Sequence, residues 1–308
     1  MSTATVAILL CTHNGERFLA AQLDSFARQT HPNWTVWASD DGSTDGTLAL
    51  LERYRTSWGS AKLNILKGPG TGSSANFLSL ACHNSITADY FSYADQDDVW
   101  NEDKLARALA QLSSTPAQTP ALYFSRTTLI DEANQELGIS RLFTRPASFQ
   151  NALVQNIGGG NTMVFNVRAR DILCSAGPVV NVVVHDWWTY MVVTGCGGIV
   201  VNDPVPSLRY RQHGTNQIGS NLGFGARMLR AGQLLEGRFR SWTDTNIQAL
   251  QAIEPRLTPE NRQVLSLFRA ARKAPLIPRL IGVVRSGITR QSFIDNLGLY
   301  VAAVLNRL

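Results

Sequence analysis

The sequence has no long hydrophobic run. Of its 308 residues 44% are hydrophobic, yet no apolar stretch approaches the roughly 20 residues that a membrane-spanning helix needs. The first apolar run, residues 6–11, follows no basic leader and ends at once in Thr12-His13-Asn14. This pattern predicts a first β-strand and not a signal peptide. We therefore expect a folded protein with neither a spanning helix nor a secretory leader.

Cysteine is scarce as well. The four cysteines, Cys11, Cys82, Cys174 and Cys196, stand far apart and show no metal-knuckle spacing. A disulfide framework is therefore not expected, and free thiols in a reducing cytoplasm are predicted. The sequence also contains no internal repeat and no low-complexity tract. A charged content of 17% fits a folded chain and not a disordered one.

Positive charge is concentrated near the C-terminus. Residues 225–308 contain 13 Lys and Arg against 5 Asp and Glu, a net charge of +8, so residues 1–224 carry −3 of the total of +5. Such a basic tail favours an anionic partner, either a lipid surface or nucleic acid, or it is a set of solvated helix faces. The residues alone support these two interpretations about equally.

Residues 5–135 alternate between strand and helix patterns. Helices joining successive strands imply right-handed crossovers and a mainly parallel sheet. The expected strands are residues 6–11, 34–39, 63–66, 90–94 and 121–130, and the expected helices are 15–29, 73–86, 101–112 and one carrying Leu48, Leu51 and Tyr54.

The pattern loosens after residue 135. A turn, Gly158-Gly159-Gly160-Asn161, leads into a strand at 162–166, and residues 182–193 lead to an expected hairpin across 197–211. Beyond residue 225, prolines separate Leu- and Arg-rich helical segments. We predict two parts: an α/β domain over 1–224, and a basic helical extension over 225–308 that faces the membrane or the acceptor.

Polar residues follow the predicted strands where each one ends. Ligands of parallel sheets bind beyond the carboxyl ends of the strands, so these groups are expected to converge there. The groups are Thr12-His13-Asn14, Asp40-Asp41-Gly42-Ser43, Lys67-Gly68 and Asp95-Gln96-Asp97-Asp98.

The last group places three carboxylates within four positions. Unpaired carboxylates are costly in a core, but at a strand end they suit a hard divalent cation that also binds phosphate oxygens. Asp95-Gln96-Asp97-Asp98-Val99 fits equally the nucleophile motif of haloacid-dehalogenase-type phosphatases, with Asp95 as nucleophile. That motif normally closes the first strand, whereas this one closes the fourth.

Two further residues have both a structural and a chemical interpretation. Asp186, in His185-Asp186-Trp187-Trp188, is either a helix cap or a general base tuned by partial burial. His213 is either an ordinary polar residue or a third ligand for Mn²⁺ or Mg²⁺. Of the pair Asp40-Asp41, one carboxylate is expected to remain available to a base or a ribose.

In this order and spacing the motifs resemble the family 2 glycosyltransferases with a GT-A fold, and within them the rhamnosyltransferase-like bacterial branch. The resemblance spans about residues 5–220, and six motifs in order are very specific. The matching stretches are residues 9–16, 39–45, 75–77, 95–100, 185–188 and 210–216. The family usually has tyrosine where His13 stands.

The resemblance implies a Rossmann-like, mainly parallel mixed sheet flanked by helices, with a C-terminal helical extension. It also implies a catalytic base, Asp186, and a cation, Mn²⁺ or Mg²⁺, bound by Asp95, Asp97 and His213. The residues that it implies for the donor nucleotide site are Thr12, His13, Asn14, Glu16, Asp41, Asn76, Asp95 and Gln96.

The expected function is that of an inverting, metal-dependent glycosyltransferase. The resemblance implies a nucleoside-diphosphate sugar as donor, with rhamnose as the sugar suggested by the branch. The expected acceptor is a hydroxyl of a cell-surface polysaccharide or a lipid-linked saccharide, met in the cytoplasm at the inner face of the membrane. No nucleic acid partner is expected. The alternatives are the phosphatase and a non-catalytic nucleotide-sugar binder.

Overall fold

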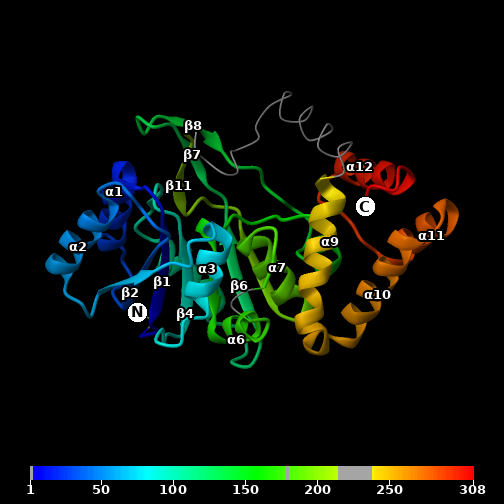
Figure 1. The fold of residues 1–308 in the computed structure, drawn as a ribbon, viewed down its shortest axis with the longest axis horizontal. Coiled ribbons are helices and arrows are strands. Elements are labelled where there is room, and N and C mark those ends of the chain that lie inside the picture. The colour runs from blue at the N-terminus through cyan, green and yellow to red at the C-terminus, as the bar shows by residue number, and fades with distance from the viewer. Residues whose placement is uncertain (1–2, 178–179, 214–237) are drawn as a thin grey trace.

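A seven-stranded sheet forms the centre of the protein. The computed structural model describes residues 3–177, 180–213 and 238–308 (Figure 1). All strands of this sheet run parallel except β9, which is antiparallel to both of its neighbours. In spatial order the strands are β10 (Ile199–Asp203), β6 (Ala121–Ser125), β9 (Val164–Asn166), β4 (Tyr90–Ala94), β1 (Val6–Thr12), β2 (Trp34–Asp40) and β3 (Leu63–Lys67).

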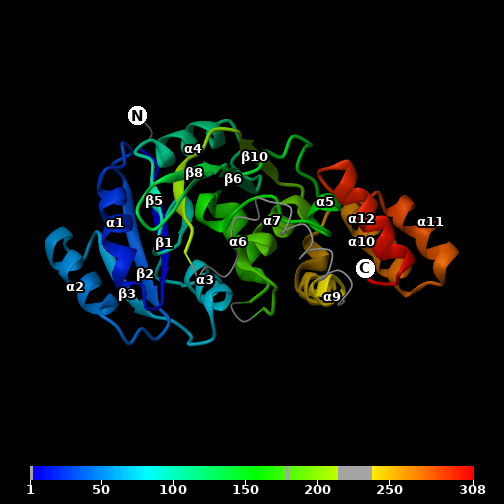
Figure 2. The same cartoon turned by 90° about the horizontal axis from the view of Figure 1, so that it is seen from above.

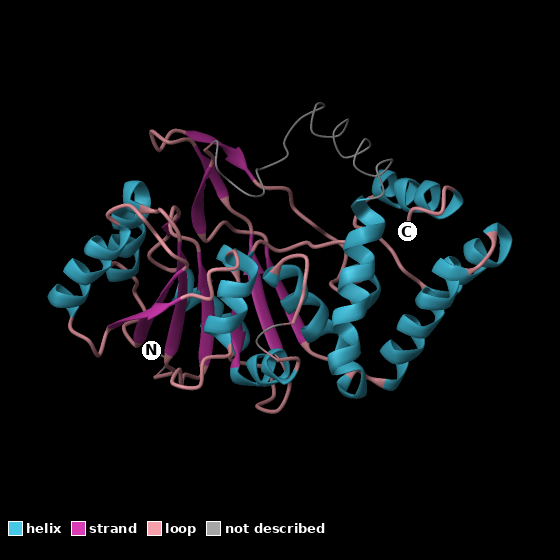
Figure 3. Cartoon of the chain, in the orientation of Figure 1, coloured by secondary structure: helices cyan, strands magenta, loops and turns pink. Residues whose placement is uncertain are grey.

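Helices cover both faces of this sheet, which Figures 2 and 3 show from above and from the side. Strand β1 is buried over its whole length because it is apolar on both faces. Val6, Ile8 and Leu10 enter one core, while Ala7 and Leu9 enter the other. The first core contains residues of α1 (Glu16–Ala27), α2 (Thr47–Trp58) and α4 (Lys104–Leu112). The second contains residues of α3 (Ser73–Ala81), α6 (Val167–Ser175) and α7 (His185–Gly195).

The sequence predicted these strands and helices with small errors at their ends. The helix expected over 73–86 ends at Ala81, and that expected over 101–112 begins at Lys104. The strand expected over 162–166 begins at Val164, after a single 3₁₀ turn at Gly160–Thr162. The mainly parallel α/β sheet is confirmed.

A second sheet corrects two predictions. The strand expected over 121–130 is in fact β6 and β7, which lie in different sheets, and the hairpin expected across 197–211 is wrong because β10 and β11 do not pair. Pro204 and Pro206 have no N–H with which to continue a ladder between β10 and β11. In order, the second sheet contains β5 (Val99–Trp100), β11 (Leu208–Arg211), β7 (Thr128–Ile130) and β8 (Glu136–Ile139).

The C-terminal part is helical, as expected. Leu250, Leu265 and Phe268 join the same core as the sheet face covered by α7, so these helices pack against the sheet domain. The predicted boundary between residues 224 and 225 lies outside the described residues. No helix in the described part of the chain is long and apolar enough to cross a membrane. The helices are α9 (Arg238–Leu250), α10 (Pro259–Lys273), α11 (Leu276–Ser286) and α12 (Phe293–Val304), with a 3₁₀ helix at Gln251–Arg256.

Candidate active site

The parallel register brings the predicted polar groups together. Thr12 at the end of β1 pairs with Asp40 at the end of β2, and Leu10 pairs with Ala94 at the end of β4. The segments after these strands therefore emerge side by side, as expected for a parallel sheet. Asp95 follows β4 directly, so the carboxylates leave the sheet beside the segment that begins at Thr12.

The adjacent aspartates Asp40 and Asp41 have different tasks. Asp40 is buried and accepts hydrogen bonds from the Thr12 hydroxyl at 2.8 Å and from the Ser43 backbone N–H at 2.9 Å. It therefore holds the turn after β2. Asp41 accepts the backbone N–H groups of Gly70 at 2.6 Å and Gly72 at 2.9 Å. Each of its carboxylate oxygens can accept a second donor, so the predicted contact with a base stays a prediction.

Asn76 of α3 holds the end of β2 through hydrogen bonds to Ser39. Its side chain is 1% exposed, and its amide accepts from the Ser39 hydroxyl and donates to the Ser39 carbonyl oxygen at 2.9 Å. The family resemblance implies that Asn76 is one of the nucleotide-binding residues. Its amide groups join α3 to β2 in the interior, and the predicted contact with the nucleotide stays a prediction.

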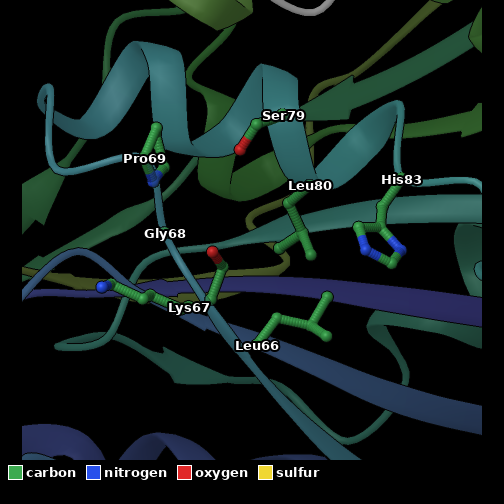
Figure 4. Close-up of a pocket in the computed structure, with 8 residues that line it drawn as sticks. Leu66, Lys67, Gly68, Pro69, Ser79, Leu80 and His83 are labelled. Atoms are coloured by element: carbon green, nitrogen blue, oxygen red, sulfur yellow. The ribbon is translucent and has the colours of Figure 1, made fainter.

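A pocket of about 200 Å³ lies between β3 and α3 (Figure 4). It contains none of Asp95, Asp97 and Asp186, so it is separate from the carboxylates expected to carry out transfer. Its lining residues are Ser39, Leu66, Lys67, Gly68, Pro69, Ser79, Leu80 and His83.

Gln96 connects the segment after β4 to the segment after β1 through hydrogen bonds. Its side chain accepts the His13 backbone N–H at 2.8 Å and donates to the His13 carbonyl oxygen at 3.0 Å. A side chain at Gly15 would collide with this amide, because a Cβ there would overlap Gln96 Oε1. Gln96, predicted to bind the nucleotide, thus also fixes the backbone of His13.

Asn14 and Glu16 hold the loop after β2. Asn14 adopts a left-handed conformation with a φ of 48°, which asparagine tolerates better than most residues. Its side-chain oxygen accepts the Thr44 backbone N–H at 2.8 Å. The Glu16 carboxylate accepts the Gly46 N–H at 2.9 Å. Both residues therefore stabilise the rim of the site.

Asp97 and His213 meet in space. The distance between His213 Nε2 and Asp97 Oδ2 is 2.6 Å, and the two side chains are only 11% and 18% exposed. The guanidinium of Arg211 donates to the Asp97 carbonyl oxygen at 3.0 Å. The predicted metal ligands at these two positions are therefore adjacent. Gly214, Thr215 and Asn216, from the same sequence motif, lie outside the described residues.

Asp95 completes this group electrostatically. Burial, the carboxylate of Asp97 and the carboxylate of Asp186 together raise the pKa of Asp95 to about 7. Two carboxylates and one imidazole are a suitable donor set for Mg²⁺ or Mn²⁺. A cation there would offset the repulsion that adds to the effect of burial on this pKa, so the residue types suit the predicted metal. The described residues contain no ready-made cluster of three such ligands.

Asp186 lies in the first turn of α7, whose N-cap is Val184. It is therefore not the cap residue. Its carboxylate accepts the Gly160 N–H at 3.0 Å and the Trp187 N–H at 2.6 Å, and it also bonds the side chain of Asn156. Burial nevertheless raises the pKa of Asp186 to about 6. A partly exposed carboxylate of this kind is suited to act as a general base near neutral pH.

A buried network that sequence analysis missed lies beneath the carboxylates. Asp98 is fully buried and accepts from the Asn161 amide at 2.7 Å and the Arg211 backbone N–H at 3.2 Å. The ammonium of Lys104 is also buried and donates to the Asn161 carbonyl oxygen at 2.9 Å. This network joins β11 to the loop after β4. The turn containing Asn161 was visible in the sequence, but nothing there indicated what it contacts.

Comparison with known proteins decides the family. The model of glycosyl transferase family 2 matches residues 7–168, which is more than half of the chain and includes the carboxylates after β4. The chain belongs to glycosyl transferase family 2. This assignment argues against the phosphatase alternative, in which Asp95 would be a nucleophile.

This glycosyltransferase is similar to other bacterial proteins. It is 29% identical over 237 residues to the dTDP-rhamnosyl transferase RfbG of Shigella flexneri, covering 72% of this chain and 78% of that protein. It is 30% identical over 107 residues to the putative glycosyltransferase EpsE of Bacillus subtilis, covering 35% of this chain and 38% of that protein.

Solved structures show the fold of the family 2 glycosyltransferase. The structure of residues 1–349 of S. aureus TarS matches with a TM-score of 0.56 at 15% identity, covering 98% of this chain and 89% of that one. The mannosyltransferase PcManGT from Pyrobaculum calidifontis, in complex with GDP-Man and Mn²⁺, matches with a TM-score of 0.53 at 16% identity, covering 100% and 86%. The predicted GT-A fold is thereby confirmed.

Proposed function

We propose that the protein is an inverting glycosyltransferase that uses Asp186 as its catalytic base. The observation that carries this proposal is the position of Asp186 beside the end of β4. Its neighbour His185 packs edge-on against Tyr93 of β4, with 4.8 Å between ring centroids, and Asp95 follows that strand directly. The carboxylate of Asp186 also contributes to the raised pKa of Asp95. Inversion needs one base and no protein nucleophile.

The reaction is a single displacement. The acceptor hydroxyl gives its proton to the Asp186 carboxylate, and its oxygen attacks the anomeric carbon from the face opposite the diphosphate. The bond between that carbon and the phosphate oxygen breaks, and its electron pair leaves with the nucleoside diphosphate. The N–H groups of Gly160 and Trp187 hold the carboxylate in one orientation, which reduces the entropy lost on reaching the transition state.

Asp95, Asp97 and His213 would hold a divalent cation, Mn²⁺ or Mg²⁺, in this proposal. A bound cation supplies positive charge against the diphosphate leaving group. The complex of the structural neighbour PcManGT contains GDP-Man and Mn²⁺, which supports the combination of a nucleotide sugar and a divalent cation for this chain.

For the donor we propose dTDP-rhamnose, because the relative RfbG is a dTDP-rhamnosyl transferase. The acceptor is proposed to be a hydroxyl of a cell-surface polysaccharide or of a lipid-linked saccharide, reached at the cytoplasmic face of the membrane. The four cysteines are free thiols, which supports a reducing compartment.

A thermal-shift screen of nucleotide sugars, each with and without Mn²⁺, tests the donor and the cation together. The expected result is a rise in the melting temperature with dTDP-rhamnose that is larger when Mn²⁺ is present. Release of dTDP on addition of an acceptor then separates an enzyme from a non-catalytic binder. Stabilisation by beryllium fluoride without any response to nucleotide sugars would favour the phosphatase and contradict the proposal.

A further inference from the structure

Helices α11 and α12 expose large apolar side chains at the C-terminal end of the protein. Ile277 is 70% exposed, Ile294 is 70% exposed and Phe293 is 79% exposed. Soluble proteins scatter such residues singly, and a gathering of them indicates an interaction site. We call this set the α11–α12 surface: Leu276, Ile277, Ile281 and Val284 of α11, with Phe293, Ile294, Leu297, Val301 and Val304 of α12.

Helix α12 is apolar on both of its sides. Its inner side buries Leu299, Ala302 and Ala303, while its larger residues, among them Phe293 and Leu297, point outward. A helix that is apolar all round needs a second apolar environment. Its 12 residues extend only about 18 Å, well short of the roughly 30 Å of a bilayer core. Such a helix can lie in a membrane interface but cannot span the membrane.

The charges around this surface are almost all positive. Residues 274–308 contain four arginines and a single acid, Asp295. Arg279 is buried and donates to the carbonyl oxygens of Ala274 and Ala303, whereas Arg285 and Arg307 are exposed. Asp295 is already engaged, because its carboxylate accepts from the Ser292 hydroxyl at 2.6 Å and pairs with Arg141 at 3.2 Å. A region of this charge is complementary to anionic lipid headgroups.

The same charges disfavour a second copy of the chain as the occupant. A twofold interface brings the same patch of each subunit together. The arginines of one copy would then meet those of the other, with one engaged acid on each side to compensate. Like charges opposed across an interface are costly, so an anionic surface fits better than a self-association.

The N-terminal end of α12 is joined to the segment that follows the second sheet. The Arg145 backbone N–H donates to Gln291 Oε1 at 3.0 Å, and Gln291 donates in return to the Arg145 carbonyl oxygen at 3.1 Å. In Figure 1, α12 lies on the upper side of the molecule, as β7 and β8 do, but to the right of the central strands and beyond α9. Docking through α12 would therefore turn the side of the molecule that carries the carboxyl ends of the strands toward a membrane.

We propose that the α11–α12 surface inserts into the interface of an anionic lipid bilayer, with α11 and α12 lying in the membrane plane. Phe293, Ile294 and Ile277 enter the boundary between headgroups and acyl chains, while Arg285 and Arg307 contact lipid phosphates. This mode combines apolar burial with electrostatic attraction, the two contributions that hold interfacial helices. The proposal that this surface binds a bilayer rests on the proposed function in one respect only, namely that binding would bring a lipid-linked acceptor near Asp186.

The test is co-sedimentation of the full chain with sucrose-loaded vesicles, either of phosphatidylcholine alone or with 30 mole per cent phosphatidylglycerol, roughly the anionic regime in which basic helices bind. No substrate is added, so the result is separate from the glycosyltransferase activity. The wild-type chain should bind anionic vesicles more strongly than neutral ones. Raising the salt concentration should weaken this binding only in part, because screening acts on the arginines and not on apolar burial.

The decisive variant is Phe293→Gln/Ile294→Gln. It should lower the partition coefficient onto anionic vesicles by about tenfold or more, because two of the most exposed large apolar side chains of this surface are lost. The matched control is Leu48→Gln/Val205→Gln, which changes two residues that are 42% and 54% exposed elsewhere on the molecule. It should bind vesicles as the wild type does, and circular dichroism should show both proteins folded.

Arg285→Gln/Arg307→Gln gives a second measurement, and it should remove the preference for anionic vesicles. The mass in solution, from light scattering, tests the rival occupant. Absence of vesicle binding by the wild type would overturn the proposal. An equal loss of vesicle binding in Phe293→Gln/Ile294→Gln and in its control, Leu48→Gln/Val205→Gln, would also overturn it. Vesicle-free dimers that become monomers in Phe293→Gln/Ile294→Gln, without a change in vesicle binding, would show a second copy to be the occupant.

Discussion

His213 Nε2 lies 2.6 Å from Asp97 Oδ2, although 116 positions separate the two residues in the chain. Asp97 lies in the loop after β4, and His213 follows β11 of the second sheet. The contact exists because Asp98 accepts the Arg211 backbone N–H and Arg211 donates to the Asp97 carbonyl oxygen. The second sheet thus brings an imidazole, the third of the predicted metal ligands, to carboxylates that the first sheet supplies.

Replacement of either member of this pair should weaken the binding of a diphosphate in the presence of Mn²⁺. For Asp97→Ala and His213→Ala we expect a loss of roughly tenfold or more in affinity for dTDP, since changes around metal ligands commonly cost 10- to 100-fold. Titration calorimetry with and without Mn²⁺ measures this. His83→Ala, in the pocket between β3 and α3, is the control. Unchanged affinity in Asp97→Ala would refute its role as a ligand.

Asp186→Asn should bind the donor but fail to transfer the sugar. The amide cannot accept the proton of the acceptor hydroxyl, and loss of a general base commonly lowers kcat by about 10²–10⁴-fold. Steady-state kinetics and calorimetry with the donor measure both quantities. Asp171→Asn provides the matched control, because Asp171 is an exposed aspartate of α6 that pairs with Arg168. A normal turnover number in Asp186→Asn would contradict the assignment.

The pH dependence of kcat should report the same base. Burial raises the pKa of Asp186 to about 6, and only the ionised form can accept a proton. The turnover number should therefore rise with pH through about 6 and then level off. Donor affinity measured at each pH separates this effect from changes in binding. A profile that stays flat between pH 5 and 7, a range of roughly one unit on each side of this pKa, would exclude Asp186 as the base.

Gly160→Ala should impair transfer by displacing the base. A Cβ at this position would lie 2.5 Å from His185 Nε2 and 3.2 Å from Asp186 Cβ, and the His185 ring is fixed by stacking on Phe77 at 4.0 Å between centroids. The Gly160 N–H that orients the Asp186 carboxylate would shift with it, so we expect kcat to fall by at least about tenfold.

The matched control for this substitution is Gly298→Ala. A Cβ at Gly298, inside α12, meets nothing within 4 Å, and alanine is a better helix former than glycine by about 1 kcal/mol. Gly298→Ala should therefore keep full activity and melt at the same or a higher temperature. An active Gly160→Ala enzyme would show that the precise orientation of Asp186 is unimportant.

The strands and helices of the sheet domain could be predicted because the local order of apolar and polar residues indicates which positions are buried. Residues 6–11 are apolar at every position, which is typical of a strand buried on both faces, and the polar residues that follow such strands must lie at one edge of a parallel sheet. The order of motifs then indicated the family. Asp95, Asp97 and Asp186 were singled out on these grounds alone.

The strand predicted over 121–130 and the hairpin over 197–211 failed for one reason. Periodicity shows that a segment is extended, but it does not show which strand the segment pairs with. Whether β7 and β11 joined the central sheet or formed their own depended on contacts such as that between Ser125 and Ser207, whose hydroxyl oxygens lie 2.6 Å apart. These contacts join segments that are distant in the sequence.

The sequence by itself determined the type of sheet, the edge at which ligands bind and the carboxylates present there, because each follows from local residue order. Only the tertiary structure decided how those groups are used. It assigned Asp40 to the turn and Asn76 to the interior, placed His213 against Asp97, and left the apolar side of α12 uncovered by the part of the chain that the structure describes. Each of these outcomes depends on which distant segments share a surface, and burial and hydrogen bonding settle that only in the folded chain.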